Sequence, residues 1–153
     1  GGCEFLSRLK NRNYTCSMIK SITSIFAVLI ISSTIQAQEY FNVDALKNTS
    51  PDHNVNVHSL CSDSYESSYI IWVQDSVKPH YHKQHTELIY VLEGKGRFFI
   101  GDTSYLIRPG DYLRIPQGKI HSFKNNTENE VKVISIQTPE FKGKDRIWVE
   151  KQH

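Results

Sequence analysis

The stretch HYHKQHTELIYVLEG runs from His80 to Gly94, and the stretch GDYLRIPQGKIHSFKN runs from Gly110 to Asn125. Both join short β-branched and aromatic runs, which favour strands, to glycine and proline residues, which favour turns. Between them they place three histidines and one glutamate in a fixed order: His80, His82, Glu87 and His121. These two stretches therefore carry most of what the sequence predicts about fold and function.

The spacing of these four residues indicates a metal site. Neutral imidazoles and a carboxylate suit a divalent first-row transition metal. His80 and His82 would share one face of a strand, whereas Glu87 would face the other way unless residues 83–86 bulge or turn. His121 arrives from a separate strand. We therefore expect one divalent transition metal, with Fe, Mn, Zn, Ni and Co all left open by this ligand set.

The rest of the pattern predicts an all-β fold. Apolar runs separated by turn residues predict strands over 69–73, 87–93, 97–100, 103–107, 112–115, 120–123 and 131–137, with a last one over 146–149. Gly94 and Gly101 suit two-residue type II′ hairpins, and Pro109-Gly110 suits a type II turn. No segment after residue 38 has a helical period, which favours a sandwich or barrel.

Both stretches match a known pair of motifs. They fit HxHxxxxExxxxxxG and GxxxxxPxGxxHxxxN, with 15 residues between Gly94 and Gly110. These motifs resemble the two signature motifs of the cupin superfamily, which are small jelly-roll β-barrels. The resemblance implies a single-domain cupin barrel over 66–141, with one metal held inside by His80, His82, Glu87 and His121. One position departs from the family, because Gln74 stands where the first motif usually opens with glycine.

The N-terminal region predicts export. Lys20, an apolar run over 25–31 and a small residue at Ala37 make a secretory signal peptide over 18–37, which predicts a periplasmic or secreted protein cut near Ala37. The alternative for the apolar run is a buried core helix. The run is too short for a stable membrane anchor. Residues 1–17 precede Met18, the only methionine, and look like an upstream extension that is not native.

Two further segments flank the predicted barrel. Residues 38–65 form an N-terminal arm with an edge strand over 55–57, and residues 142–153 form a C-terminal strand or tail. The chain has 18 basic and 16 acidic residues, so it lacks the excess of positive charge that is typical of nucleic-acid-binding proteins. The expected partner is a small molecule. The continuous apolar run over 69–73 suggests a second covering surface, which together with the habit of small cupins predicts a homodimer.

Several other residues have two open interpretations. His85 lies in the predicted bulge and is interpreted as an exposed loop histidine, the alternative being a fifth ligand or a proton shuttle. Four residues could hold an anionic substrate or face solvent: Arg97, Arg114, Lys119 and Tyr112. His53 and His58 are expected at the surface. Three aromatic residues are expected in the core or pocket lining: Trp72, Phe99 and Phe123.

The predicted site suggests a metal-dependent enzyme. Four protein ligands on an octahedral metal leave two positions open for a substrate or dioxygen. Iron would favour a dioxygenase, whereas Mn, Zn or Ni would favour an isomerase or lyase acting on a small polar molecule. Glu87 could serve as a catalytic base if it leaves the metal. The alternative is a non-catalytic cupin that binds a sugar or an organic acid.

Overall fold

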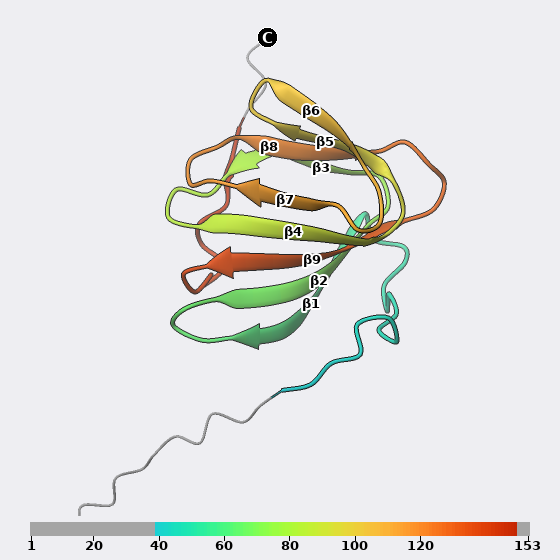
Figure 1. Cartoon of the computed structure of the whole chain (residues 1–153), viewed down its shortest axis with the longest axis horizontal. Helices are drawn as coiled ribbons and strands as arrows, with labels where there is room; N and C mark the ends of the chain where they lie inside the picture. The colour runs from blue at the N-terminus through green and yellow to red at the C-terminus, as the bar shows by residue number, and fades with distance from the viewer. Residues whose placement is uncertain (1–38, 150–153) are drawn as a thin grey trace, which may run out of the picture. The chain divides into compact units, whose positions relative to one another are not determined.

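The computed structural model describes residues 39–149, which form strands and connecting loops without any helix (Figure 1). The predicted upstream extension, signal peptide and cleavage site lie outside the described residues, so export stays a prediction. The strands are β1 (Val55–Ser62), β2 (Ser67–Val73), β3 (Ser76–Tyr81), β4 (Thr86–Glu93), β5 (Gly96–Ile100), β6 (Thr103–Ile107), β7 (Tyr112–Ile115), β8 (His121–Asn125), β9 (Val131–Thr138) and β10 (Ile147–Trp148).

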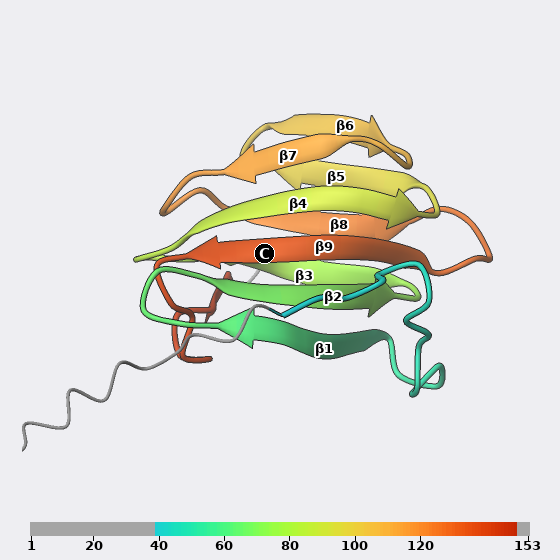
Figure 2. The same ribbon diagram turned by 60° about the horizontal axis from the view of Figure 1, so that its bottom comes forward.

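The strands form two five-stranded antiparallel sheets. The first sheet has the order β1-β2-β9-β4-β7, and the second has the order β10-β3-β8-β5-β6. Figure 2 shows the two sheets face to face, with the first sheet in front of the second. The chain crosses between them repeatedly, for example from β3 to β4 and from β8 to β9, so residues from distant segments line one interior. The all-β prediction is confirmed.

The predicted strands are all present, although β1 is longer and β10 is shorter than expected. β1 covers eight residues instead of 55–57, and it pairs with β2 along its length. β10 pairs with β3, placing Trp148 opposite His80. Both strands lie outside the predicted barrel limits of 66 and 141, yet both are integral parts of the sheets.

The inward face of the barrel is polar at one end and apolar at the other. On β4, buried Glu87 is followed by buried Ile89 and Val91. On β9, which runs antiparallel to β4, buried valines come first and buried Ser135 and Gln137 follow. The apolar end is the hydrophobic core, made by Val73, Ile89, Val91, Phe98, Ile107, Leu113, Ile115, Phe123, Val131 and Val133. The register of the sheets therefore gathers the polar side chains at one end.

Glycine is required at two turns and at one close contact between strands. Gly94 and Gly110 have φ angles of 82° and 94°, as the predicted turns require. Gly96 lies against the ring of Phe123, where a Cβ atom would come within 2.3 Å of the ring. A side chain at residue 96 would therefore push β5 away from its neighbour β8.

The N-terminal arm is attached to the first sheet by a buried lysine. Lys132 of β9 is 1% exposed, and its Nζ donates hydrogen bonds to the carbonyl oxygens of Val43 (2.7 Å) and Leu46 (2.9 Å). The same Nζ lies 3.2 Å from Oε1 of Glu93. Lys132 therefore fixes the arm, because a buried ammonium needs partners and two of its three are carbonyl groups of the arm.

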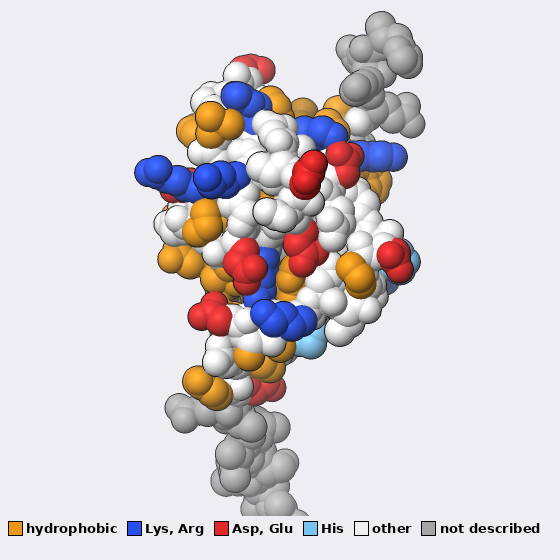
Figure 3. Space-filling model, turned by 90° about the vertical axis from the view of Figure 1, so that its right-hand side faces the viewer, with side chains coloured by type: hydrophobic (Ala, Val, Ile, Leu, Met, Phe, Trp, Pro, Cys, Tyr) orange, Lys and Arg blue, Asp and Glu red, His pale blue; other side chains and the backbone are white. Residues whose placement is uncertain are grey.

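The surface shown in Figure 3 carries acidic and basic side chains side by side, with no continuous area of one sign on that face. Mixed charge of this kind gives no extended field that would attract a nucleic acid there. Over residues 39–149, no helix is long and apolar enough to cross a membrane.

Candidate metal centre

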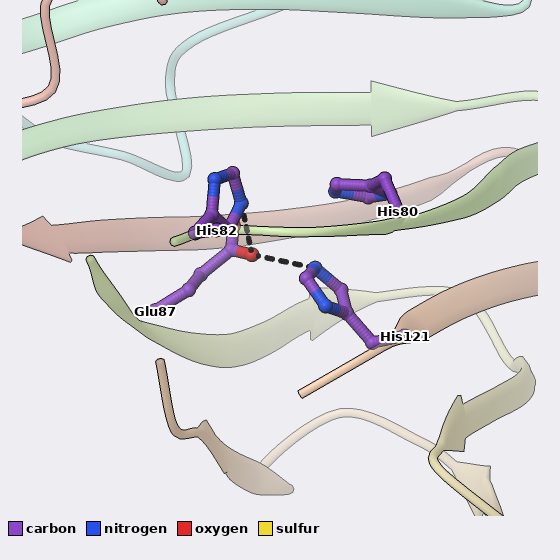
Figure 4. A group of neighbouring side chains, drawn as sticks. All are labelled: His80, His82, Glu87 and His121. Atoms are coloured by element: carbon purple, nitrogen blue, oxygen red, sulfur yellow. Dashed lines mark hydrogen bonds and ion pairs between the residues drawn. The ribbon is translucent and has the colours of Figure 1, made fainter. Parts of the chain in front are cut away.

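The four predicted ligands lie together inside the polar end of the barrel (Figure 4). His80 on β3 pairs directly with His121 on β8 in the second sheet, and Glu87 faces them from β4 in the first sheet. One ligand atom from each of the four side chains lies within 4.8 Å of all the others. Each of the four residues is at most 5% exposed, so the cluster is screened from bulk water.

A bend in the chain allows Glu87 to face the histidines although it follows His82 by an odd number of residues. β3 ends at Tyr81, the backbone bends at Lys83 and Gln84, and β4 begins at Thr86 in the facing sheet. The predicted bulge or turn is therefore confirmed. The expectation that His82 lies on the same strand as His80 is wrong in detail, because His82 follows the strand and enters the bend.

Three backbone carbonyls orient the three imidazoles. Nδ1 of His80 lies 2.8 Å from the carbonyl oxygen of Lys78, and Nδ1 of His121 lies 3.0 Å from that of Lys119. Nδ1 of His82 lies 2.6 Å from the carbonyl oxygen of Asp145. A carbonyl only accepts, so each Nδ1–H must donate, and in the neutral ring each Nε2 then carries a lone pair. Fixing the Nδ1 tautomer in this way is what metal-binding histidines require.

The Glu87 carboxylate has one oxygen fixed and one directed at the imidazoles. Ser135 donates a hydrogen bond of 2.6 Å to Oε1. Oε2 lies 3.1 Å from Nε2 of His121 and 3.4 Å from Nε2 of His82. With neutral rings, these contacts bring lone pairs face to face, which is stable only with a proton or a metal cation between them. His82 Nε2 is also buried without a hydrogen-bond partner among residues 39–149, so the site fits a metal ion.

The electrostatics of the site favour a charged carboxylate and a neutral imidazole. Burial alone would raise the pKa of Glu87, but the nearby His121 and His82 side chains and the Ser135 hydroxyl outweigh it and hold the pKa well below the usual range. Burial, and after it the proximity of His121, lowers the pKa of His80 to about 4. Metal binding needs both of these protonation states.

His85 is buried, so its interpretation as an exposed loop histidine is wrong. Its Nδ1 lies 2.5 Å from Oδ2 of Asp145, and its Nε2 lies 2.9 Å from the carbonyl oxygen of Glu140. Both ring nitrogens are therefore engaged, which leaves neither for a fifth coordination bond. The sequence pattern missed this because Asp145 lies sixty residues away in the chain.

The C-terminal segment forms one wall of the site, which sequence reasoning did not foresee. Besides holding His82 and His85, Asp145 accepts hydrogen bonds from the backbone N–H groups of Lys83 and Gln84. The ring of Phe141 lies 5.6 Å from that of His82. No sequence signal identifies this contact. Ser135 could have been found, since it continues the inward valine positions of β9 at the same spacing of two.

A cavity of about 1130 Å³ extends from the cluster into the barrel. His80, Glu87 and His121 line its polar end, and valine, isoleucine and phenylalanine side chains line much of the remainder. Phe99 and Phe123 are among them, as predicted, and Trp72 is buried. His53 and His58 are exposed as expected. The candidate anion-binding residues Arg97, Arg114, Lys119 and Tyr112 do not line the cavity, and all except half-buried Arg97 are exposed.

Comparison with known proteins identifies the family. The family model described as the cupin domain matches residues 68–137, a range that contains all four candidate ligands. An uncharacterized protein of Aquifex aeolicus is 33% identical over 84 residues, which cover 55% of this chain and 69% of that protein. This chain belongs to the cupin superfamily. The resemblance inferred from the two sequence motifs is confirmed.

Two further proteins show how far the similarity reaches. Quercetin 2,3-dioxygenase of Bacillus subtilis is 31% identical over 65 residues, which cover 42% of this chain and 19% of that protein. Among solved structures, a conserved protein of Klebsiella pneumoniae with a double-stranded β-helix domain gives a TM-score of 0.63 at 14% identity. The match covers 75% of this chain and all of that one, and it shows a shared fold.

Proposed function

We propose that this cupin is a metal-dependent enzyme that acts on a small molecule bound inside the barrel. The observation that carries the proposal is the arrangement of Nε2 of His82, Nε2 of His121 and Oε2 of Glu87, which converge inside the barrel with both Nε2 atoms within 3.4 Å of the carboxylate oxygen. His80, His82, Glu87 and His121 would hold one divalent transition metal. When bound, such a metal supplies Lewis-acid activation of the substrate and, if redox-active, dioxygen chemistry.

The surrounding residues would prepare the site for this task. Carbonyl groups of Lys78, Lys119 and Asp145 hold the imidazole rings in one tautomer before any metal arrives. Ser135 holds one oxygen of Glu87, so that the other is presented to the cluster. Burial excludes water, which strengthens every charge interaction in the site. Preorganisation of this kind favours chemistry over mere storage of a metal.

Glu87 would serve first as the anionic ligand. Its lowered pKa makes it a weak proton acceptor while it remains among the histidines. The predicted role of Glu87 as a catalytic base would therefore require that its carboxylate move away from His82 and His121. The quercetin 2,3-dioxygenase relative supports dioxygenase chemistry as one reaction class, with isomerase and lyase reactions as the others.

The test combines metal analysis with turnover. The protein is purified without oxygen, loaded separately with Fe(II), Mn(II), Zn(II), Ni(II) or Co(II), and then analysed for bound metal, oxygen consumption and isomerase or lyase turnover. We expect one bound metal per chain, and loss of both metal and turnover in His82→Ala and His121→Ala. His58→Ala is the matched control, because His58 is an exposed histidine of β1.

The outcomes separate the enzyme from its alternative. Protein that binds none of the five metals contradicts the proposal. Binding of a sugar or organic acid that survives His82→Ala, without turnover under any condition, supports a non-catalytic carrier instead. Homodimer formation and export near Ala37 are separate predictions, which size-exclusion chromatography and N-terminal sequencing of the mature protein would test.

A further inference from the structure

Arg146 presents an unpaired charge beside the candidate metal centre. It lines the cavity together with His80, and its Nε atom is buried without a hydrogen-bond partner in the part of the chain that the structure describes. No ion pair joins Arg146 to any residue in the range 39–149. A guanidinium without a partner is costly to bury, and it becomes stable when a carboxylate accepts from its N–H groups.

The register of β10 explains why Arg146 reaches this place. Trp148 pairs with His80 across the two strands, and the two rings lie 5.2 Å apart, so both side chains are on the inward face. Arg146 precedes Trp148 by two residues and lies on the same side, with its guanidinium 5.8 Å from the centre of the indole ring. Arg146 and Trp148 therefore form a cationic and aromatic pair next to a candidate metal ligand.

The charges around the cavity have the sign that an anion needs. Its charged lining residues are Lys78, Lys124, Arg146 and Glu87. Lys124 is engaged by Asp75, and Lys78 is exposed, which leaves Arg146 as the half-buried cation of the lining without an ion-pair partner among residues 39–149. Glu87 is directed at His82 and His121 and would be neutralised further by a bound metal. An anionic group entering the cavity would thus meet Arg146 without a competing carboxylate.

Most of the remaining lining is apolar, and the cavity leaves room for more than a carboxylate. The cavity volume of about 1130 Å³ exceeds what a small hydrophilic acid would fill. Its walls include Val57, Ile71, Ile89 and Phe99, and Trp148 stands half-exposed at 53%. Apolar walls with a few placed polar groups are typical of sites for organic ligands with an apolar body.

We infer that the cavity binds an organic acid with an apolar, preferably aromatic, body, whose carboxylate pairs with Arg146 and whose body packs on Trp148 and the apolar wall. The inference rests on the proposed function, since it names the substrate class of the same site. It also replaces the expectation of a small polar molecule with that of an acid that has an apolar body. The carboxylate would lie beside His80, so its position relative to the candidate metal would be set by Arg146.

The test uses matched probes on metal-free and zinc-loaded protein. Isothermal titration calorimetry compares 2-naphthoate with its neutral analogue 2-naphthamide and with acetate. We expect naphthoate to bind at least about tenfold more tightly than either, the effect of one charge-assisted hydrogen bond or of the apolar body. Arg146→Gln should remove the preference for the acid over the amide, and Trp148→Leu should weaken naphthoate more than acetate.

Matched controls keep the outcomes distinct. Arg114→Gln alters an exposed arginine of β7 and should retain the preference. Arg146→Met removes the charge but keeps an unbranched side chain, and it replaces Arg146→Gln if that variant does not fold. Equal binding of acid and amide, no carboxylate binding at 10 mM probe, or an acid preference that survives in the neutral variants overturns the inference. A preference that depends on Arg146 in protein unable to bind metal contradicts only the proposed function.

Discussion

Ser135 donates a hydrogen bond of 2.6 Å to Oε1 of Glu87 and thereby fixes which carboxylate oxygen faces the histidines. The two residues lie 48 positions apart in the chain, on the neighbouring strands β9 and β4. Without this bond, the carboxylate could rotate, and the charge presented to His82 and His121 would be less well defined. The hydroxyl is therefore expected to support the metal without touching it.

Ser135→Ala should lower metal affinity by about 10- to 100-fold, the usual effect of removing a partner that orients a metal ligand. The measurement is competition with a chelator of known affinity. Ser59→Ala is the control, since Ser59 is an exposed serine of β1. Equal metal affinities for Ser135→Ala and wild type would show that the hydrogen bond from Ser135 does not contribute to metal binding by Glu87.

Metal binding should stabilise the folded protein. At a free metal concentration about 100 times the dissociation constant, binding adds about 2.7 kcal/mol, which raises Tm by roughly 8 to 15 °C for a domain of this size. Thermal unfolding with and without chelator measures the change. Glu87→Gln should abolish most of it, because the neutral amide removes the only negative charge among the ligands. An unchanged Tm in every metal would argue against the site.

Asp145→Asn should destabilise the protein at neutral pH by about 1 to 3 kcal/mol, because the carboxylate accepts from Lys83, Gln84 and His85. Burial of Asp145 would raise its pKa, but these hydrogen bonds outweigh it and lower the pKa below its ordinary value of 3.8. A lowered folded-state pKa contributes stability that is present above pH 3.8 and is lost as the pH falls through the folded-state value.

Urea unfolding of wild type and Asp145→Asn in chelator, at pH 7 and at successive values below pH 4, tests this dependence. The stability difference should be full at pH 7 and should shrink in the acid range. A difference that stays constant with pH would mean that the charge on Asp145 does not contribute.

Lys132→Met should cost about 2 to 4 kcal/mol and release the N-terminal arm. The substitution leaves the carbonyl groups of Val43 and Leu46 without their donor and removes the charge that pairs with Glu93. Lys124→Met is the matched control, because its pair with Asp75 is solvent-exposed and should contribute less than about 1 kcal/mol. Proteolysis near residues 43–46 should become faster in Lys132→Met alone.

Much of the site is readable from local sequence. The spacing of His80, His82 and Glu87 predicts a strand, a bend and a second strand. Side-chain direction alternates along a β-strand, so Glu87 can face the histidines only if the chain bends between them. The turns at Gly94 and Gly110 are equally local, since glycine reaches positive φ at little cost. The cupin motifs add His121, which local periodicity alone could not have placed beside the others.

The residues around the ligands depend on strand order instead. His85 would be an ordinary loop residue if Asp145 were not folded back against it. Arg146 and Trp148 belong to the cavity because β10 pairs with β3, whereas the equally basic Arg114 points outward from β7. None of these contacts has a period or a spacing in the sequence.

The sequence by itself determined the all-β fold, the turns and the identity of the four candidate ligands, because each follows from alternation, turn chemistry or the two motifs. Only the tertiary structure decided that a serine on β9 holds Glu87, that Asp145 holds His82 and His85, and that Arg146 faces the cavity. The physical reason is that these contacts join segments up to 63 residues apart. Their formation depends on how two sheets pair and close, which no local pattern records.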